Sequence, residues 1–346
     1  MKTIGGWIGV VLAMSAVKCL AAGQGEVPSA TGAEVIAPTS GARTVADLDR
    51  DWRFSKGDFA SAAVPAFNDS NWRRVKLPHD WSIEGPFGPE YGSGNGYAPG
   101  GMGWYRKHFR LDPAAKGKSV AIEFDGVYDH SQVWINGHFV GGRPYGYSSF
   151  ECDLTPHLKF GTEENVVAVR VDHSRFADSR WYTGSGIYRH VRLRITDKAR
   201  IALWGIFVTT PEIREDSAVI QVETTIWNDA GVGADFSLES AIIAPEGPPV
   251  AQLSTRGHVD AGATQSLVHK IDLSRPQLWS PETPHLYALR SRFTSGTNAL
   301  DEVTTPFGIR SLQFDPDKGF FLNGKPPGSK VSAFITTPAC SVPLCR

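Results

Sequence analysis

The sequence predicts an all-β protein built from two successive β-sandwiches, and three observations lead to this prediction. Short segments that alternate apolar and polar residues recur along the chain, as half-buried strands do. The 36 Gly and 23 Pro residues supply turns between them. No convincing amphipathic helix interrupts the series. With 346 residues, the chain is long enough for two domains with separate cores.

The first 22 residues have the pattern of a signal peptide. Lys2 precedes an apolar run at 4–17, and small residues follow, so cleavage after Ala21 fits the preference of the signal peptidase. A membrane anchor is the alternative, but the run is too short to span a bilayer comfortably. Cys19 follows Lys18, which does not suit a lipoprotein signal. We therefore expect an exported protein, periplasmic or extracellular, with no membrane association after cleavage.

The first sandwich is expected at 46–197, after a flexible lead-in at 23–45 that is rich in Ala, Gly, Pro, Ser and Thr. In HSQVWINGHFVGG at 130–142, the dipeptide Asn136-Gly137 suits the positive φ angles of a tight hairpin turn, so two strands should meet there. Short strands at this spacing predict a jelly-roll sandwich. The other predicted strands are SVAIEFDGV at 119–127, NVVAVRVD at 165–172 and HVRLRI at 190–195.

A second series of strands predicts an immunoglobulin-like sandwich at 198–309, because turn signals separate its segments at intervals typical of that fold. The segment SLQFDPDKGFFLNGK, within 310–326, then predicts a hairpin that leads into a further domain. From 327 to 346 the strand pattern is lost. The predicted strands of the second sandwich are IALWGIFVTTPEI, AVIQVETTIWND, ADFSLESAII, SLVHKIDL and LYALRSRF.

Composition excludes several kinds of function. A net charge of −1 argues against nucleic acid as a partner, since phosphate binding needs a basic surface. Removal of Cys19 leaves three cysteines, Cys152, Cys340 and Cys345, which is no disulfide framework and has no zinc spacing. Cys152 is expected to be a small buried residue. The Gly-rich loop at 90–103 lacks the Lys-Ser/Thr ending of a phosphate-binding loop, so we expect no bound nucleotide. We also expect no metal and no other cofactor.

Two loops carry candidate ligand-binding residues. In LPHDWSIEGPF at 77–87, Asp80 beside Trp81 could hydrogen-bond a sugar that rests on the indole ring; alternatively Trp81 is core and Asp80 caps a turn, which the residues alone favour. In SRWYTGSGIYRH at 179–190, aromatic and arginine side chains surround three glycines, which suits either a bound carbohydrate or the docking of another domain.

Catalytic residues do not follow from the spacing of the acids. Asp125, Asp129, Asp153 and Asp172 stand at predicted strand ends or turns, where carboxylates commonly make local hydrogen bonds. No nucleophile elbow of the form G-x-S-x-G occurs, and the histidines form no metal-binding pattern. No catalytic residue is therefore assigned within this chain.

Four long motifs nevertheless form a family signature. LPHDWSIEGPF, GGMGWYRKHFRL, FDGVYDHSQVWINGHFVG and SRWYTGSGIYRHVRL, in this order, resemble the N-terminal part of glycoside hydrolase family 2, most closely its β-galactosidases. The resemblance covers about residues 45 to 326 and includes FGIRSLQFDPDKGFFLNGKP, which leads toward the catalytic barrel of that family. It implies a sugar-binding jelly roll, then an immunoglobulin-like domain, then a TIM barrel that carries the acid/base and nucleophile glutamates of a retaining glycosidase.

The resemblance also supplies candidate sugar contacts. The loop with Arg180, Trp181 and Tyr182 matches the jelly-roll loop that can contribute to the barrel's sugar pocket, and Asp80 is a second candidate. Some members of the family have Asp just before that Trp, where this chain has Arg180. The implied partner is a β-galactoside; mannoside and glucuronide specificities and an oligomeric state stay open.

The end of the chain departs from the family. About twenty residues follow Lys325, whereas a barrel needs roughly 250. Back-translated from Lys330 and shifted by one step, the codons permit Gly-Val-Cys-Ile-His-His-Asp, close to the family's next strand. We therefore expect a frameshift near 326–328 and an inactive N-terminal fragment of a β-galactosidase. The alternative is a pair of β domains that acts as a carbohydrate-binding or interaction module.

Overall fold

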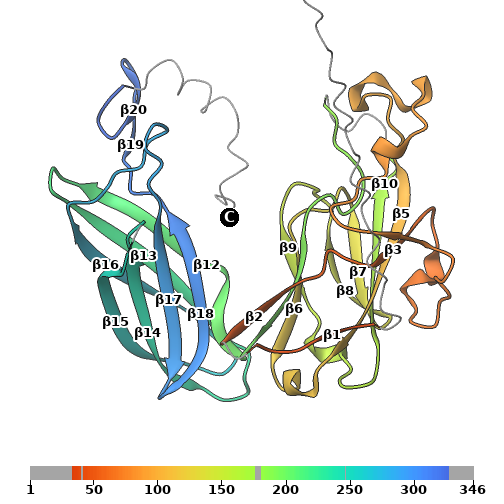
Figure 1. Cartoon of the computed structure of the whole chain (residues 1–346), viewed down its shortest axis with the longest axis horizontal. Coiled ribbons are helices and arrows are strands. Elements are labelled where there is room, and N and C mark those ends of the chain that lie inside the picture. The colour runs from red at the N-terminus through yellow and green to blue at the C-terminus, as the bar shows by residue number, and fades with distance from the viewer. Residues whose placement is uncertain (1–32, 40–41, 176–180, 246, 327–346) are drawn as a thin grey trace, which may run out of the picture. The chain divides into compact units, whose positions relative to one another are not determined.

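The computed structural model describes residues 33–39, 42–175, 181–245 and 247–326, and Figure 1 shows that they are built mainly of strands. Two sandwiches follow one another along the chain, the first with a seven-stranded and a four-stranded sheet, the second with a three-stranded and a four-stranded sheet. The predicted fold class, all-β with two successive sandwiches, is confirmed. Across the described ranges, no helix has the length and apolarity needed to span a membrane.

The larger sheet of the first sandwich has the order β4-β3-β5-β10-β7-β8, with β1 pairing in parallel along β5, and the smaller has the order β2-β11-β6-β9. Alternate residues of both sheets point into one apolar core that includes Trp52, Phe109, Phe124 and Leu193. The strands are β1 (Glu34–Ile36), β2 (Arg43–Asp47), β3 (Trp52–Lys56), β4 (Arg73–Val75), β5 (Gly101–Leu111), β6 (Ser119–Phe124), β7 (Ser131–Ile135), β8 (His138–Arg143), β9 (Phe150–Asp153), β10 (Asn165–His173) and β11 (Val191–Thr196).

The hairpin predicted about Asn136-Gly137 is confirmed. Both residues have positive φ, 50° and 87°, as a two-residue turn with the right-handed twist of the strands requires. The strands that it joins are β8, at the edge of the larger sheet, and its neighbour β7. Cys152 of β9 is buried, as predicted, and burial raises the pKa of its thiol to about 12.

The second sandwich packs the sheet β12-β13-β16 against the sheet β15-β14-β17-β18. Strand β13 alternates inward and outward residues along most of its length, and its buried Ile220 and Val222 contribute to the core. The strands are β12 (Ala199–Ile213), β13 (Ser217–Asn228), β14 (Ala234–Ile243), β15 (Pro249–Val259), β16 (Thr264–Ser274), β17 (Tyr287–Ser295) and β18 (Asn298–Phe307); the expected hairpin follows as β19 (Leu312–Asp315) and β20 (Gly319–Leu322).

Part of the expected flexible lead-in is ordered, which corrects that prediction. Glu34–Ile36 forms β1 beside β5, and Arg43 begins β2. Ile36 is buried in the first core, and this burial of an apolar side chain stabilises the segment although the residues around it are small or polar. The signal-peptide prediction at 1–22, the first ten residues of the lead-in and the tail at 327–346 lie outside the described residues.

The two sandwiches are joined by an ion pair between β2 and β18. The guanidinium of Arg43 donates from Nε to Oδ1 of Asp301 at 2.8 Å and from Nη2 to Oδ2 at 2.6 Å. Asp301 is fully buried and also accepts the backbone N–H of Ile201 at 2.8 Å. Because a buried carboxylate is costly unless it is paired, this contact fixes Arg43 against the second domain.

A second buried carboxylate, Asp69, ties a loop to the larger sheet of the first sandwich. Its Oδ2 accepts from Arg106 Nε at 2.7 Å and from His108 Nε2 at 2.8 Å, and Arg53 pairs with Oδ1. Burial alone would raise the pKa of Asp69, but the hydrogen bonds from His108 and Arg106 outweigh it and hold that pKa well below its usual value.

Candidate functional site

Three loops that are far apart in the sequence meet at one end of the first sandwich. The backbone N–H groups of His79 and Trp81 donate to the carbonyls of Ile187 at 2.9 Å and Ser185 at 3.1 Å, so the loops at 77–87 and 181–190 run side by side. The Gly-rich loop at 90–103 joins them, because Thr183 donates its N–H to Oδ1 of Asn95 at 3.2 Å. The motifs singled out in the sequence therefore form one surface.

Asp80 lies where the first two loops touch. Its Oδ1 accepts the backbone N–H groups of Ser82 at 2.9 Å and Ser185 at 2.8 Å, and its Oδ2 accepts the hydroxyl of Tyr182. These three donors fix the position of a carboxylate that is only partly buried. A carboxylate has about four acceptor positions, so a ligand hydroxyl can still bind to it.

Gly184 makes this approach sterically feasible. Its φ is +75°, a left-handed conformation that glycine adopts at little cost. A Cβ atom at this position would lie 2.7 Å from Oδ2 of Asp80, closer than ordinary contact allows. The glycine therefore allows the loop to pass directly over the carboxylate.

Burial and the contact with Asp80 both act on the phenol of Tyr182. Burial, the hydrogen bond to Asp80 and the negative charge of that carboxylate all raise the pKa of the Tyr182 phenol. The phenol stays neutral at physiological pH and acts as a donor toward Asp80. Since 44% of Tyr182 is exposed, its ring can also contact a ligand.

Aromatic side chains extend this surface beyond Asp80. Trp181 is 61% exposed, and its Nε1 donates to Oη of Tyr147 at 2.9 Å, which orients the indole. Tyr145 packs edge-on against Tyr147, with ring centroids 5.7 Å apart. Exposed aromatic faces beside a fixed carboxylate match the chemistry of a pyranose, which has apolar C–H faces and polar hydroxyl edges.

The structure separates the two interpretations of the loop at 77–87. Trp81 is 1% exposed and stacks on Phe54 with centroids 5.5 Å apart, so it belongs to the core, as the residues alone favoured. Asp80 does cap a turn through Ser82, and it also binds Tyr182. Of the four predicted contact residues, Asp80, Trp181 and Tyr182 lie together, whereas Arg180 lies outside the described residues.

A network of hydrogen bonds between buried side chains stabilises the loops of the candidate site. The hydroxyls of Ser82 and Ser185 are 2.5 Å apart, and that of Ser185 is 2.6 Å from Nδ1 of His173. Ser82 also donates to the carbonyl of Pro99 at 2.7 Å. These hydrogen bonds hold the two loops at fixed separation, because each buried hydroxyl loses stability if its partner moves.

Sequence reasoning missed these supporting residues and Tyr147. Serines and asparagines in loops are common, and nothing in the sequence pairs Ser82 with Ser185 or Asn95 with Thr183, since each pair is separated by more than 80 residues. The cluster of tyrosines in RPYGYSSF was the available signal for Tyr147.

Three of the four acids at strand ends, Asp129, Asp153 and Asp172, make local contacts, as predicted, whereas Asp125 pairs with a residue 67 positions away. Asp125 pairs with Arg192 at 2.8 Å and Asp129 with His130 at 2.8 Å. Asp153 accepts the N–H of Thr155 at 3.0 Å, and Asp172 accepts the hydroxyl of Ser174 at 2.6 Å. Within the part of the chain that the structure describes, no group of three or more His, Cys, Asp or Glu side chains could hold a metal ion.

Two family models match the chain. Residues 45–197 match the sugar-binding domain of glycosyl hydrolases family 2, and residues 199–310 match the second model of the same family. The chain belongs to glycosyl hydrolase family 2. Its candidate site at 77–103 and 181–190 therefore lies within the residues that match the family's sugar-binding domain.

Relatives within family 2 include both galactosidases and glucuronidases. β-Galactosidase BoGH2A from Bacteroides ovatus is 45% identical over 82% of this chain and 33% of its own length. A putative β-glucuronidase from Formosa agariphila is 36% identical over 84% of the chain and 27% of its own length. Among solved structures, a family 2 member from Bacteroides cellulosilyticus matches with a TM-score of 0.77 and 38% identity, covering 81% of this chain and 37% of its own. The chain spans about a third of the length of these relatives.

Proposed function

We propose that residues 45–310 are the non-catalytic N-terminal part of a retaining β-galactosidase of family 2. The observation that carries this proposal is the 45% identity to a β-galactosidase over 285 residues. Glycoside hydrolysis needs two carboxyl groups on either side of the scissile bond, whereas the candidate site is built around the single carboxylate of Asp80. Asp80, anchored by three donors, is suited to contact a substrate hydroxyl instead.

The first test is hydrolysis by the 346-residue chain. With p-nitrophenyl β-D-galactopyranoside we expect no release of nitrophenol above that of heat-treated protein. Turnover that survives repurification would overturn the assignment of these domains as non-catalytic.

The second test joins these domains to the catalytic part of a relative in a chimeric protein. Residues 45–310 replace the corresponding part of the Bacteroides ovatus β-galactosidase, and kinetics are measured on the same galactoside. Trp181→Ala is expected to raise KM at least fivefold, because it removes the exposed aromatic face beside Asp80. Trp204→Ala, an exposed Trp of β12 in the other domain, is the matched control and should leave KM unchanged. Equal KM for both variants would exclude a sugar contact at Trp181.

A β-glucuronide is the second candidate substrate, since relatives that are 36% and 33% identical are named as glucuronidases. The galactoside and the glucuronide should be compared in the same chimera. A binding module without catalysis is favoured by one observation, the exposed pair of Trp181 and Tyr182. Saturable galactose binding by the 346-residue chain, with no hydrolysis, would support that role.

We also propose export. The apolar run at 4–17 after Lys2 supports it. Expression in a Gram-negative host, followed by fractionation and N-terminal sequencing, should give a mature chain that begins at Ala22. Full-length protein in the cytoplasmic fraction would contradict export.

A further inference from the structure

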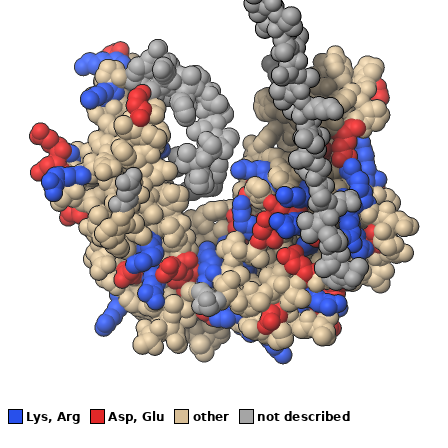
Figure 2. Space-filling model, viewed as in Figure 1, with Lys and Arg blue, Asp and Glu red and all other residues tan. Residues whose placement is uncertain are grey.

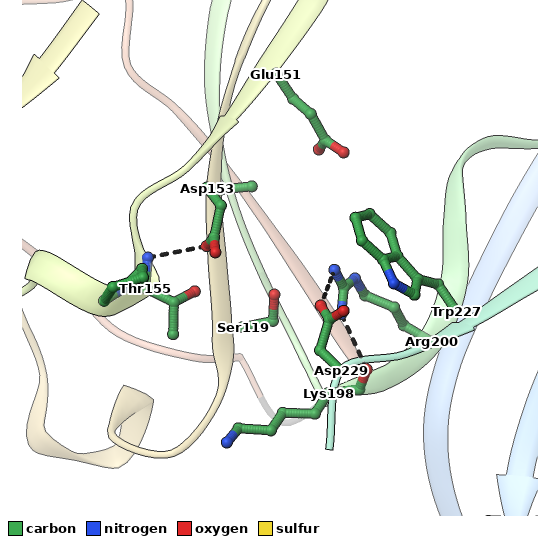
Figure 3. A pocket seen from close by; sticks show the side chains of 10 residues that line it. Ser119, Glu151, Asp153, Thr155, Lys198, Arg200, Trp227 and Asp229 are labelled. Carbon is green, nitrogen blue, oxygen red and sulfur yellow. Dashed lines mark hydrogen bonds and ion pairs between the residues drawn. The ribbon is translucent and has the colours of Figure 1, made fainter. Parts of the chain in front are cut away.

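A cavity of about 380 Å³ lies between the smaller sheet of the first sandwich and the beginning of the second (Figure 3). Its first wall consists of β6, β9 and the turn after β9, which supply Ser119, Glu151, Asp153 and Thr155. Its second wall consists of the start of β12, the end of β13 and one residue flanking each strand; the side chains are Lys198, Arg200, Trp227 and Asp229. This volume falls within the range of small-molecule sites in proteins. The cavity is formed by other residues than the Asp80 site.

The second wall is held in place before any ligand binds. Arg200 is 7% exposed, pairs with Asp229 at 2.6 Å and donates to the carbonyl of Lys198 at 2.9 Å. Arg200 and Trp227 are register partners on β12 and β13, and the guanidinium carbon lies 4.7 Å from the centre of the indole ring. Trp227 is still 37% exposed, so part of its apolar surface faces solvent at the cavity.

The first wall supplies hydrogen-bonding groups on the opposite side of the cavity from this indole. Figure 3 shows Asp153 and Thr155 on the side of the cavity away from Trp227, with Ser119 of the same wall drawn between them and Arg200. Asp153 is exposed and uses Oδ1 to accept the N–H of Thr155, which fixes the carboxylate. Glu151 is oriented by an ion pair with Arg194, which is 5% exposed.

The charges that line the cavity nearly cancel. Three carboxylates, Glu151, Asp153 and Asp229, face two cationic side chains, Lys198 and Arg200, and Arg194 stands behind Glu151. A strongly charged ligand of either sign would meet like charges. On the face shown in Figure 2, Lys and Arg side chains likewise lie among Asp and Glu side chains, without a large area of one sign. A neutral ligand with many hydroxyls and one apolar face fits best.

We infer that this cavity is a second carbohydrate site, distinct from the Asp80 surface, which binds a neutral hexose unit of an oligosaccharide. The exposed part of the Trp227 indole contacts the C–H face of the sugar. The carboxylates of Asp153 and Asp229 accept its hydroxyl protons, and Lys198 donates to its oxygens. Because one wall comes from each sandwich, a bound sugar bridges the two domains.

The experiment first weakens binding at the Asp80 surface, so that binding at the cavity can be measured. Lactose is titrated into the 346-residue chain carrying Trp181→Ala, and binding is followed by tryptophan fluorescence and by saturation-transfer NMR. We expect saturable binding with a dissociation constant on the order of 1 mM, as suits one or two sugar rings in a small site. Methyl β-D-glucuronide should bind at least fivefold more weakly, because its carboxylate meets the three acidic side chains.

Two further variants assign the binding to the cavity. Adding either Trp227→Ala or Asp153→Ala should weaken lactose binding at least tenfold, whereas adding Trp204→Ala, outside the cavity, should not change it. Asp153→Ala guards against misfolding, since this exposed side chain makes one local turn contact, and circular dichroism checks each variant. Absence of lactose binding up to 50-fold above the expected constant overturns the inference. So does binding that survives both substitutions, or tighter binding of the glucuronide.

Discussion

Replacing Arg43 by Met should destabilise the protein through a single buried carboxylate. Arg43→Met keeps much of the side-chain volume but leaves Asp301, which is fully buried, without its cation. Three hydrogen bonds are lost, one to the carbonyl of Ile201 and two to Asp301. The two to Asp301 are charge-assisted and contribute about 1.5–3 kcal/mol each, which gives about 3–6 kcal/mol. Breaking a buried ion pair typically costs about 3–5 kcal/mol. Because Ile201 still donates its N–H to Asp301, we expect a loss of about 3–4 kcal/mol.

Urea unfolding, followed by circular dichroism and tryptophan fluorescence, measures this loss from the shift in midpoint. Adding Asp301→Asn to Arg43→Met should recover at least about 1 kcal/mol, because no charge is then left buried. The matched control is Arg214→Met, whose pair with Glu212 is exposed on both sides and should change stability by less than about 0.5 kcal/mol. A loss below about 1 kcal/mol for Arg43→Met, or no recovery in the double variant, would refute the reasoning.

The remaining predictions concern the candidate site and its support. Asp80→Asn should lower the raised pKa of Tyr182 toward its usual value, because the negative charge is removed. Ultraviolet titration at 295 nm measures this pKa, with the parent chain and Tyr182→Phe as references. A titration curve that Asp80→Asn leaves unchanged would contradict the contact. Gly184→Ala should lower stability by about 1–3 kcal/mol, since φ is +75° and the new Cβ would lie 2.7 Å from Asp80. Gly231→Ala, with open space around it, should change stability by less than about 0.5 kcal/mol in the same thermal scans; equal effects would exclude the steric argument. Asp69 has a lowered pKa in the folded protein, so it stabilises the fold at pH values above its unfolded pKa of about 3.9, and this stabilisation is lost as the pH falls through the folded pKa. Asp69→Asn should therefore lower Tm most at pH 7 and make the decline of Tm below pH 4 less steep. Parallel profiles of Tm against pH for the variant and the parent chain would disprove this linkage.

The sequence by itself determined the fold class and the local elements that short-range physics controls. Alternation along 119–127 predicted the strand that the structure contains as β6, and the largely apolar segment at 165–172 predicted β10. Asn136-Gly137 predicted its hairpin because two positive φ angles are a local requirement. Strands with weaker patterns, such as β15 and β18, were missed, because their stability comes from neighbours in the sheet rather than from their own periodicity.

The candidate site divides in the same way. Asp80, Trp181 and Tyr182 could be selected from the sequence by residue type and by resemblance to a family, and Trp81 could be assigned to the core. Only the tertiary structure joined Asp80 to Tyr182, 102 residues apart, and showed that one carboxylate both caps a turn and binds a phenol. The cavity beside Trp227 was decided by tertiary structure alone, because its walls come from two domains. Local propensities act over a few residues, whereas a binding site forms where distant segments pack together.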